Sequence, residues 1–254
     1  MCSSDLKQEK NMMTAPVVKI IDSSVVDGPG NRAVIFLQGC NYNCKYCHNP
    51  ETIEPAGGQK GLQQLTADEV AERLGRNLPF IRGLTISGGE CMLHEEFVYE
   101  VCTEAKRRYG QDFSCLLDSN GSIPYDKVLP VIDGVLLDVK AVDESAHRAL
   151  TGAPAGPALS QAAALAKVGK LIEIRTVVLG ETGEAEACVR ETARKISAAA
   201  GKEALEKIAY KLIKYRPKGV RKEYLRELKV PSGPELERLA ALARDCGFGS
   251  VIVV

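Results

Sequence analysis

The chain alternates short apolar runs with longer segments of helical periodicity, and this alternation is the feature that most constrains its fold. Some of the runs, such as 33–37 and 251–254, are apolar at consecutive positions, as expected for strands that are buried on both faces. The sequence predicts strands over 33–38, 83–87, 113–117, 134–138, 171–178, 207–215 and 250–254. A repeated strand–helix order favours a parallel sheet with helices outside it.

Helical segments fill the intervals between these strands. We predict helices over 66–78, 94–109, 125–131, 159–168, 184–199 and 233–246. Thr66 and Glu69 form a capping-box pattern at the start of the first helix, and Gly169 and Gly247 stand where helix C-caps belong. Six or seven strand–helix units are too few for a closed barrel of eight. We therefore expect an α/β fold with an incomplete, open parallel barrel of the (β/α)6 type.

Composition limits the setting in which the protein works. The formal net charge is +0 and the pI is about 6.8, so we expect no nucleic acid partner, although a local basic stretch runs from Lys207 to Lys222. Nine cysteines, an odd number, argue against a disulfide framework and for a reducing cytoplasm. No apolar run is long enough to span a bilayer, so we expect no membrane partner. Residues 1–14 are polar and are predicted to be a disordered tail, with 15–254 forming a single domain.

Three cysteines lie close together with the spacing C-x3-C-x2-C, namely Cys40, Cys44 and Cys47. Clustered thiolates of this kind hold iron–sulfur clusters. Three ligands for the four irons of a 4Fe–4S cluster leave one iron open, as the metals of catalytic sites keep an open position. The alternative is a Cys3His zinc site that includes His48. Zinc sites usually pair two short ligand clusters across a longer gap, and no second cluster is present, so the spacing favours iron–sulfur.

Polar motifs follow several of the predicted strands. Gly88-Gly89-Glu90 follows the second strand, Asp118 and Asp138 follow the third and fourth, and Lys140 comes two residues later. Because the carboxyl ends of parallel strands share one face of a sheet, we expect these residues near the cysteines. The glycine pair with Glu90 suits the ammonium of an amino-acid-like ligand, or forms an ordinary turn. The two aspartates suit a hard cation, or act as helix N-caps.

Arg175 interrupts an otherwise apolar strand, and a buried arginine needs an anion. We expect a ligand carboxylate there rather than Glu173, which is predicted to face the other way. His94 and His147 are expected on the surface at helix starts. The cysteines that follow the C-x3-C-x2-C motif do not cluster, and most are expected to be small core residues. They are Cys91, Cys102, Cys115, Cys188 and Cys246.

With these residues together, the chain resembles the radical S-adenosylmethionine (SAM) enzymes, and more narrowly the glycyl-radical-enzyme activases, which include the pyruvate formate-lyase activating enzymes. The resemblance runs from about residue 19 to residue 224, and its motifs are specific jointly but weak singly. They are Asp27-Gly28-Pro29-Gly30, Gln38-Gly39-Cys40, Cys44 to Pro50, Ser87 to Glu90, Asp118 with Asn120-Gly121, and Asp138 with Lys140.

The resemblance implies the chemistry. One 4Fe–4S cluster on the three cysteines, with SAM on its open iron, would generate a 5′-deoxyadenosyl radical that removes a hydrogen from a glycine Cα of a partner glycyl radical enzyme. Tyr46 would lie against the adenine, and Gly88 to Glu90 would meet the methionine ammonium. Lys140 and Arg175 would bind the carboxylate or the ribose. Asp118 would also contact the cofactor.

The resemblance also implies further partners. Asp118 and Asp138 would share a monovalent cation, flavodoxin or ferredoxin would supply the electron, and the enzyme would be a cytoplasmic monomer. We expect Asp27-Gly28-Pro29-Gly30 to dock the partner at the rim of the site, with a plain turn as the alternative. The loop 50–65 contains no cysteine, so one cluster is expected. Arg216 stands where these activases carry a histidine.

Two other classes of function compete with this interpretation. The first is a radical SAM enzyme that acts on a small molecule, of the 7-carboxy-7-deazaguanine synthase type. The segment Asp27-Gly28-Pro29-Gly30 favours the activase over it. The second is an electron carrier or structural metal protein. The missing fourth ligand and the Gly88-Gly89-Glu90 motif argue against this second class.

Overall fold

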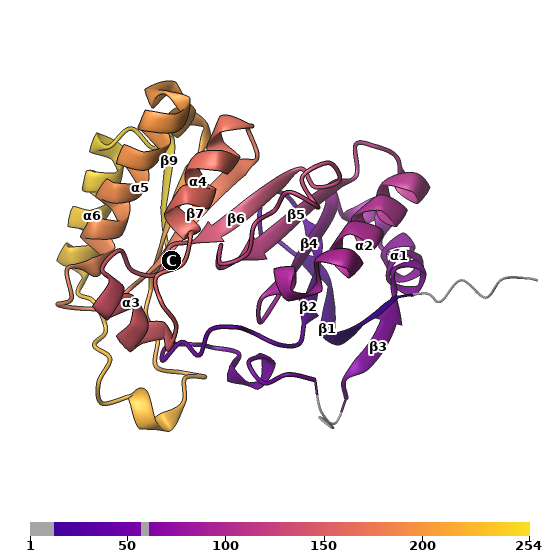
Figure 1. Cartoon of the computed structure of the whole chain (residues 1–254), viewed down its shortest axis with the longest axis horizontal. Coiled ribbons are helices and arrows are strands. Elements are labelled where there is room, and N and C mark those ends of the chain that lie inside the picture. The colour runs from indigo at the N-terminus through magenta and orange to yellow at the C-terminus, as the bar shows by residue number, and fades with distance from the viewer. Residues whose placement is uncertain (1–12, 57–60) are drawn as a thin grey trace, which may run out of the picture.

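The computed structural model describes residues 13–56 and 61–254, and in these residues nine strands form one curved sheet (Figure 1). Their order across the sheet is β3-β1-β2-β4-β5-β6-β7-β8-β9. From β2 onward all neighbours pair in parallel, whereas β1 pairs antiparallel with β2 and β3. The strands are β1 Thr14–Ser24, β2 Arg32–Leu37, β3 Gln63–Thr66, β4 Gly83–Gly88, β5 Ser114–Ser119, β6 Gly134–Asp138, β7 Leu171–Val178, β8 Ala209–Lys214 and β9 Ser250–Val253.

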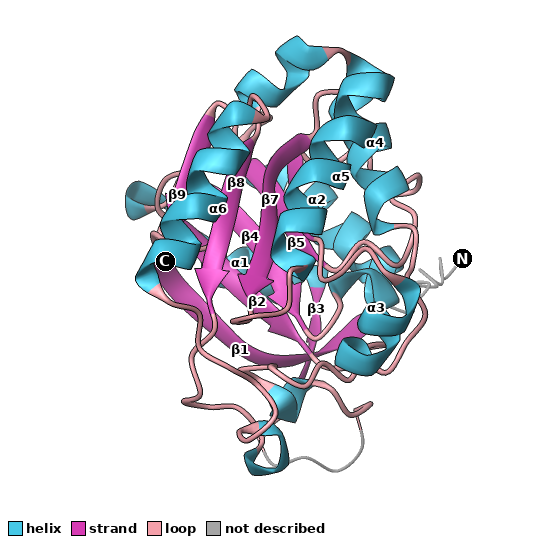
Figure 2. Ribbon diagram, turned by 90° about the vertical axis from the view of Figure 1, so that its left-hand side faces the viewer, coloured by secondary structure: helices cyan, strands magenta, loops and turns pink. Residues whose placement is uncertain are grey.

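Helices cover the convex face of this sheet. The helices α1 and α2 lie over its first half and α4, α5 and α6 over its second half (Figure 1), and α5 and α6 stand in front of β7 to β9 in Figure 2. The end of α3 contacts the loop after β2. The helices are α1 Ala67–Gly75, α2 Glu95–Tyr109, α3 Glu144–Thr151, α4 Ala158–Lys167, α5 Glu184–Ala200 and α6 Gly233–Asp245. The capping box predicted at Thr66 and Glu69 is present. The predicted open, mostly parallel α/β architecture is confirmed.

Several elements differ from the predictions. The strand β1 was not predicted, because Lys19 and Asp22 interrupt its apolar run, and β3 lies inside the stretch predicted as a loop. The helix predicted over 125–131 is wrong, since this stretch forms consecutive hydrogen-bonded turns that include Pro130. The short helix α3 was missed. His147 belongs to α3 and is buried, so its predicted surface position is also wrong.

The two faces of the parallel strands have different side chains, because alternate residues of a strand point in opposite directions. The convex face carries the apolar core under the helices, for example Ile35, Ile86 and Leu137. The concave face carries polar groups near the strand ends, among them Asp118 and Arg175. The same strands therefore supply both a dry core and a polar interior.

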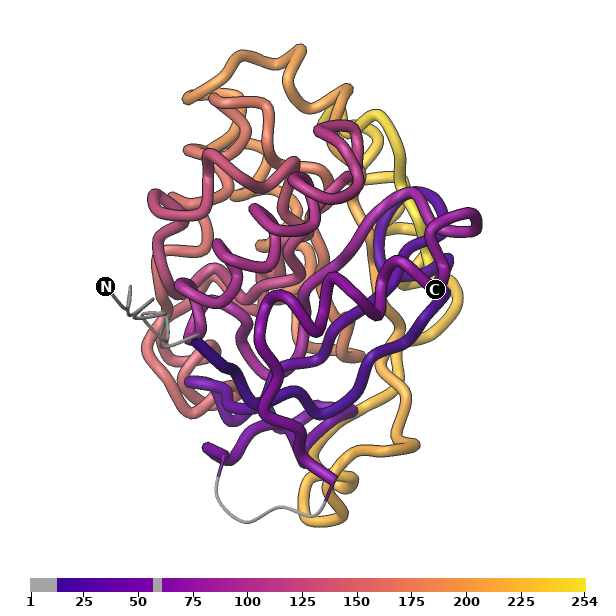
Figure 3. The backbone as a smooth tube through the Cα atoms, turned by 90° about the vertical axis from the view of Figure 1, so that its right-hand side faces the viewer, coloured from indigo at the N-terminus to yellow at the C-terminus, as the bar shows by residue number. Residues whose placement is uncertain are grey.

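The predicted tail falls largely outside the described residues, which begin at residue 13, and its last residue, Thr14, already starts β1. No helix among the described residues combines the length and apolar character that crossing a membrane requires. Seen from its other side, the molecule presents its N-terminal third, in indigo and purple, toward the viewer (Figure 3).

Candidate active site

A cavity of about 360 Å³ lies on the concave face at the carboxyl ends of the parallel strands. Most of the predicted site residues line it, although they come from distant parts of the sequence. These are Cys40, Cys44, Tyr46, Cys47, Gly88, Gly89, Asp118, Asp138, Lys140 and Arg175, together with Asp27. A cavity of this volume is within the ordinary range for small-molecule sites.

The three cysteines lie on the loop after β2, which main-chain hydrogen bonds hold in place. Cys40 N donates to Ile53 O at 3.0 Å, and Cys47 N donates to Cys44 O at 3.1 Å. The end of α3 also holds this loop, since Asn43 N donates to Thr151 O at 2.7 Å. These main-chain contacts do not use the thiols, and the hydrogen bond that Cys40 Sγ accepts from Tyr42 N at 3.4 Å leaves its other lone pairs available to a metal.

The donor set fits an iron–sulfur cluster better than a single metal ion. Among residues 13–56 and 61–254, no three His, Cys, Asp or Glu side chains are grouped to share one ion. Ligands of a cluster bind different irons and need not converge on one point. His48, the fourth ligand of the zinc alternative, has its Nε2 2.9 Å from Arg216 O instead. Burial raises the pKa of the Cys40 thiol to about 12, so a metal must displace its proton.

The glycines of the Gly88-Gly89 pair are required by backbone packing. A Cβ on Gly88, whose φ is +135°, would lie 2.2 Å from Leu37 O, and one on Gly89 would lie 2.1 Å from Gly39 O. Both residues also line the cavity. The sequence analysis explained these glycines by the close approach of a ligand. In the structure the backbone of Leu37 and Gly39 makes this close approach, so the β4 loop packs directly against the cysteine loop.

Glu90 is not among the residues that line the cavity, and its contact with a ligand stays a prediction. Its side chain is fully buried, and its carboxylate accepts hydrogen bonds from Ser119 Oγ at 2.7 Å, Asn120 N at 2.7 Å and Met92 N at 3.0 Å. Burial raises the pKa of this carboxyl, against the effect of these donors. Glu90 thus fastens the β4 loop to the β5 loop behind the site.

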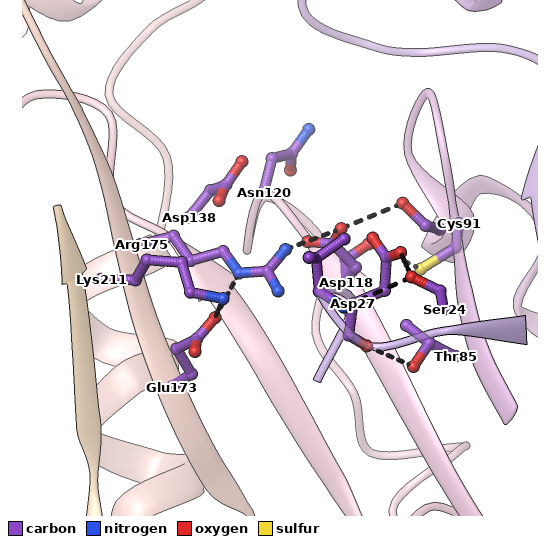
Figure 4. Close-up of polar contacts among 12 residues, drawn as sticks. Ser24, Asp27, Thr85, Cys91, Asp118, Asn120, Asp138, Glu173, Arg175 and Lys211 are labelled. Atoms are coloured by element: carbon purple, nitrogen blue, oxygen red, sulfur yellow. Dashed lines mark hydrogen bonds and ion pairs between the residues drawn. The ribbon is translucent and has the colours of Figure 1, made fainter. Parts of the chain in front are cut away.

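A chain of buried charges crosses the concave face (Figure 4). Arg175 Nη1 lies 3.0 Å from Asp118 Oδ2, and Arg175 Nε donates to Glu173 Oε1 at 2.5 Å. Lys211 Nζ lies 2.9 Å from the same Glu173 oxygen. The expectation that Glu173 faces away from Arg175 is wrong, because residues two apart on a strand share a face. Arg175 Nη2 is buried and has no hydrogen-bond partner among residues 13–56 and 61–254.

A second pair lies on the neighbouring strand end. Lys140 Nζ is 2.8 Å from Asp138 Oδ2 and 5.7 Å from the centre of the Tyr46 ring. Burial opposes the charge on Lys140, but Asp138, Tyr46 and Cys44 together outweigh it, so the pKa of the ammonium is raised well above its usual value. Each of the two aspartates that sequence analysis brought together therefore has a side-chain cation of its own.

The segment Asp27-Gly28-Pro29-Gly30 joins β1 to β2 and enters the concave face. Thr85 Oγ1 donates to Asp27 O at 2.7 Å, and Figure 4 places Asp27 beside Asp118. Gly28 has φ +121°, and a Cβ there would lie 3.0 Å from Leu116 Cδ1. Asp27 therefore lines the interior, while Pro29 and Gly30 are exposed.

Some residues of the site were not predicted. Ser87, Ser119 and Lys19 also line the cavity. Ser87 Oγ donates to Asp118 Oδ2 at 3.0 Å, and its position at the end of β4 could have indicated this. Arg216, expected where the activases carry a histidine, has an exposed side chain that does not line the cavity.

Comparison with known proteins identifies the class. Residues 26–152 match the family model described as a 4Fe-4S single cluster domain. A glycyl-radical enzyme activating enzyme of Haemophilus influenzae, itself named only provisionally, is 32% identical over 94% of this chain and 96% of its own length. The chain belongs to the family of glycyl-radical-enzyme activating enzymes.

Two further proteins are similar to this chain. The pyruvate formate-lyase-activating enzyme of Clostridium pasteurianum is 32% identical over 78% of this chain and 83% of its own length. Among solved structures, QueE from Escherichia coli superposes with a TM-score of 0.56 over 95% of this chain and 94% of its own, at 16% identity. At that identity the likeness concerns the fold alone.

Proposed function

We propose that this protein activates a glycyl radical enzyme, with one 4Fe–4S cluster on Cys40, Cys44 and Cys47 and with SAM in the adjoining cavity. The observation that carries the proposal is that one cavity gathers the three thiols with the polar ends of β4 to β7. When bound and reduced, the cluster and SAM supply the 5′-deoxyadenosyl radical that takes a hydrogen from a glycine Cα.

The residues around the cavity fit the cofactor. The buried Arg175 Nη2 has no protein acceptor, so it can donate to the carboxylate of SAM without giving up a bond. Lys140 offers a second cation beside Tyr46, whose ring would lie against the adenine. The backbone of Gly88 and Gly89 lines the same space and can accept from the ammonium. Asp118 orients Arg175 at 3.0 Å.

The proposal also includes a monovalent cation shared by Asp118 and Asp138. Arg175 and Lys140 already lie within 3.0 Å and 2.8 Å of these carboxylates. Charge balance alone therefore does not require an ion. A cation would bind only if the SAM carboxylate, on arrival, drew either basic side chain away from its aspartate.

The activase is favoured over an enzyme that acts on a small molecule, because the relatives with the higher identity are activases. The protein substrate is a glycyl radical enzyme, and pyruvate formate-lyase is one candidate. Asp27-Gly28-Pro29-Gly30 would meet the incoming glycine loop, since Asp27 lines the same cavity as the three cysteines. We further propose a monomer that receives its electron from flavodoxin or ferredoxin.

The test is anaerobic reconstitution with iron and sulfide, followed by reduction with dithionite in the presence of SAM. We expect methionine and 5′-deoxyadenosine by chromatography, and a glycyl radical by electron paramagnetic resonance when pyruvate formate-lyase or another glycyl radical enzyme is added. Cys44→Ala serves as the control without a complete cluster. Cleavage of SAM by the wild type, with no radical on any glycyl radical enzyme, would overturn the assignment as an activase.

A further inference from the structure

The segment after β8, residues 215–229, covers the outside of the cysteine loop, and we call it the cluster strap. Arg221 Nη2 donates to Cys44 O at 3.0 Å and to Asn43 O at 3.2 Å. Lys45 Nζ pairs with Glu227 at 2.6 Å. In Figures 1 and 3 the strap is the gold loop at the lower edge of the molecule, beside the indigo segment that follows β2 in Figure 1.

The inner side of the strap is packed against the loop. Tyr215 and Val220 are buried in one apolar cluster with Cys44 and Tyr46, and Leu228 packs against this cluster. Apolar packing of this kind fixes the strap as a rigid cover. Only its outer side is left to meet another molecule.

The outer side carries a concentrated positive charge. The strap has six basic and two acidic residues, a net charge of +4, while the whole chain has a net charge of +0; the remainder of the chain is therefore at −4. Lys218, Lys222 and Arg226 are exposed, and none forms an ion pair within the described residues. These are solvated charges that stabilise the fold little.

The structure also divides the basic stretch that the sequence presents as continuous. Lys207 precedes β8 and lies at the opposite end of this strand from the strap, and Lys211 points into the barrel to Glu173. The charge that remains together is the part over the cysteine loop. Its position, rather than the sum of charges in the sequence, calls for an explanation.

We propose that the cluster strap is the docking surface for a small acidic electron-carrier protein. This inference rests on the proposed function, because the electron must reach a cluster on the cysteine loop. The strap touches the backbone of Cys44 directly, so a carrier docked on it is separated from the cluster by one layer of protein. One electron would pass from the reduced flavin or iron–sulfur centre of the carrier to the cluster. The carrier would be oxidised by one electron and the cluster reduced by one electron, with no bond made or broken.

Charge complementarity explains why this face would be used. A positive patch on a molecule whose remaining surface is net negative attracts an acidic protein in one orientation. Such steering acts over about 10 Å at 0.1 M salt. A nucleic acid is a less suitable partner, since the negative remainder of the chain would repel an extended polyanion.

The test compares two triple variants with equal changes of charge. The first reverses three charges on the strap and is Lys218→Glu/Lys222→Glu/Arg226→Glu. The second reverses the charges of exposed lysines in α5 and in the segment before β8, and is Lys195→Glu/Lys202→Glu/Lys207→Glu. Reduced flavodoxin, an acidic flavoprotein, is mixed with each reconstituted protein in a stopped-flow instrument, and flavin oxidation is followed by absorbance. We expect the second-order rate constant to fall at least about tenfold for the strap variant at low salt, and less than about twofold for the control.

Two further measurements separate the possible outcomes. The difference should shrink at high salt, and anisotropy should show weaker binding of labelled oxidised flavodoxin to the strap variant. Reduction by dithionite and the resulting SAM cleavage should match the wild type; if the wild type itself cleaves no SAM with dithionite, the proposed function fails instead. Equal flavodoxin rates for both variants would overturn the inference. So would a strap variant that takes electrons normally but installs fewer glycyl radicals, because the strap would then dock the glycyl radical enzyme.

Discussion

Arg175 and Glu173 lie on the same face of β7, and Arg175 Nε donates a hydrogen bond of 2.5 Å to Glu173 Oε1. Glu173 is itself held by Lys211 at 2.9 Å, so the carboxylate is shared between two cations. With Nε and Nη1 engaged, the guanidinium is fixed while its Nη2 stays without a partner. Glu173 is therefore a positioning residue for the group that we propose binds the SAM carboxylate.

Replacing Glu173 with glutamine should loosen Arg175 without removing it. We expect Glu173→Gln to weaken SAM binding by about tenfold, the loss of one charge-assisted contact worth roughly 1.5 kcal/mol. Calorimetry on protein with an intact cluster measures this effect. Glu237→Gln, on the exposed side of α6, is the control for loss of one charge. An unchanged affinity would show that Arg175 needs no help from Glu173.

The cluster ligands give a prediction of stoichiometry. Reconstituted wild-type protein should hold about four irons per chain, because one group of three thiols serves one cluster. Cys40→Ala, Cys44→Ala and Cys47→Ala should each lose most of this iron. Cys91→Ala is the matched control, since Cys91 is buried beside Glu90 and outside the cavity lining. Iron near eight per chain, or loss of the cluster in the control, would contradict the assignment.

Lys140 should matter more for the cofactor than for the fold. We expect Lys140→Ala to weaken SAM binding by roughly 1.5–3 kcal/mol, because one charged partner of the ligand is lost. Asp138 is partly exposed, so water can solvate it in the variant and limit the loss of stability. Calorimetry with an intact cluster and a thermal melt are the two measurements. A large fall in Tm with unchanged affinity would assign Lys140 to the fold.

The architecture could be predicted from the sequence because the parallel strands are buried on both faces. The apolar runs of β2 and β6 have few other interpretations, and their C-terminal ends converge by topology alone. The strand β1 was not predicted because its exposed positions are polar, and antiparallel strands near a sheet edge tolerate polar residues on their exposed face. The helix α3 has only 8 residues, too few for a clear helical period.

The details of the site were harder to predict than its location. Arg175 was placed correctly, but its partner Glu173 was rejected through an error of strand periodicity. Glu90 looked like a ligand-facing carboxylate because a Gly-Gly turn usually lies at the surface. Its three donors come from Met92 and from the β5 loop, and no local pattern in the sequence indicates that these segments meet.

Glu90 should therefore be a residue of the fold. In Glu90→Ala, the donors of Met92, Ser119 and Asn120 lose their acceptor, and each unpaired buried group costs about 1–3 kcal/mol. Water entering the vacated space would offset part of this cost. We expect Tm to fall by roughly 5–15 °C, given about 2–4 °C per kcal/mol for a chain of this size. A variant as stable as the wild type that fails to bind SAM would restore the original assignment of Glu90.

Asp27 allows cofactor chemistry and partner docking to be separated. It lines the cavity from the segment between β1 and β2, and its carboxylate accepts a hydrogen bond from Ser24 Oγ at 2.5 Å. Neither this bond nor the bond from Thr85 to the Asp27 carbonyl involves a residue of the cysteine loop. We expect Asp27→Ala to cleave SAM at the wild-type rate when dithionite is the reductant and no partner is present. It should install at least about tenfold less glycyl radical on a partner, measured by electron paramagnetic resonance, because a charge-assisted contact to the glycine loop is lost.

Ser24→Ala, which keeps the carboxylate, is the control for local packing. If both activities of Asp27→Ala fall together, the segment supports the cofactor site or the fold; if neither falls, Asp27 to Gly30 is only a turn.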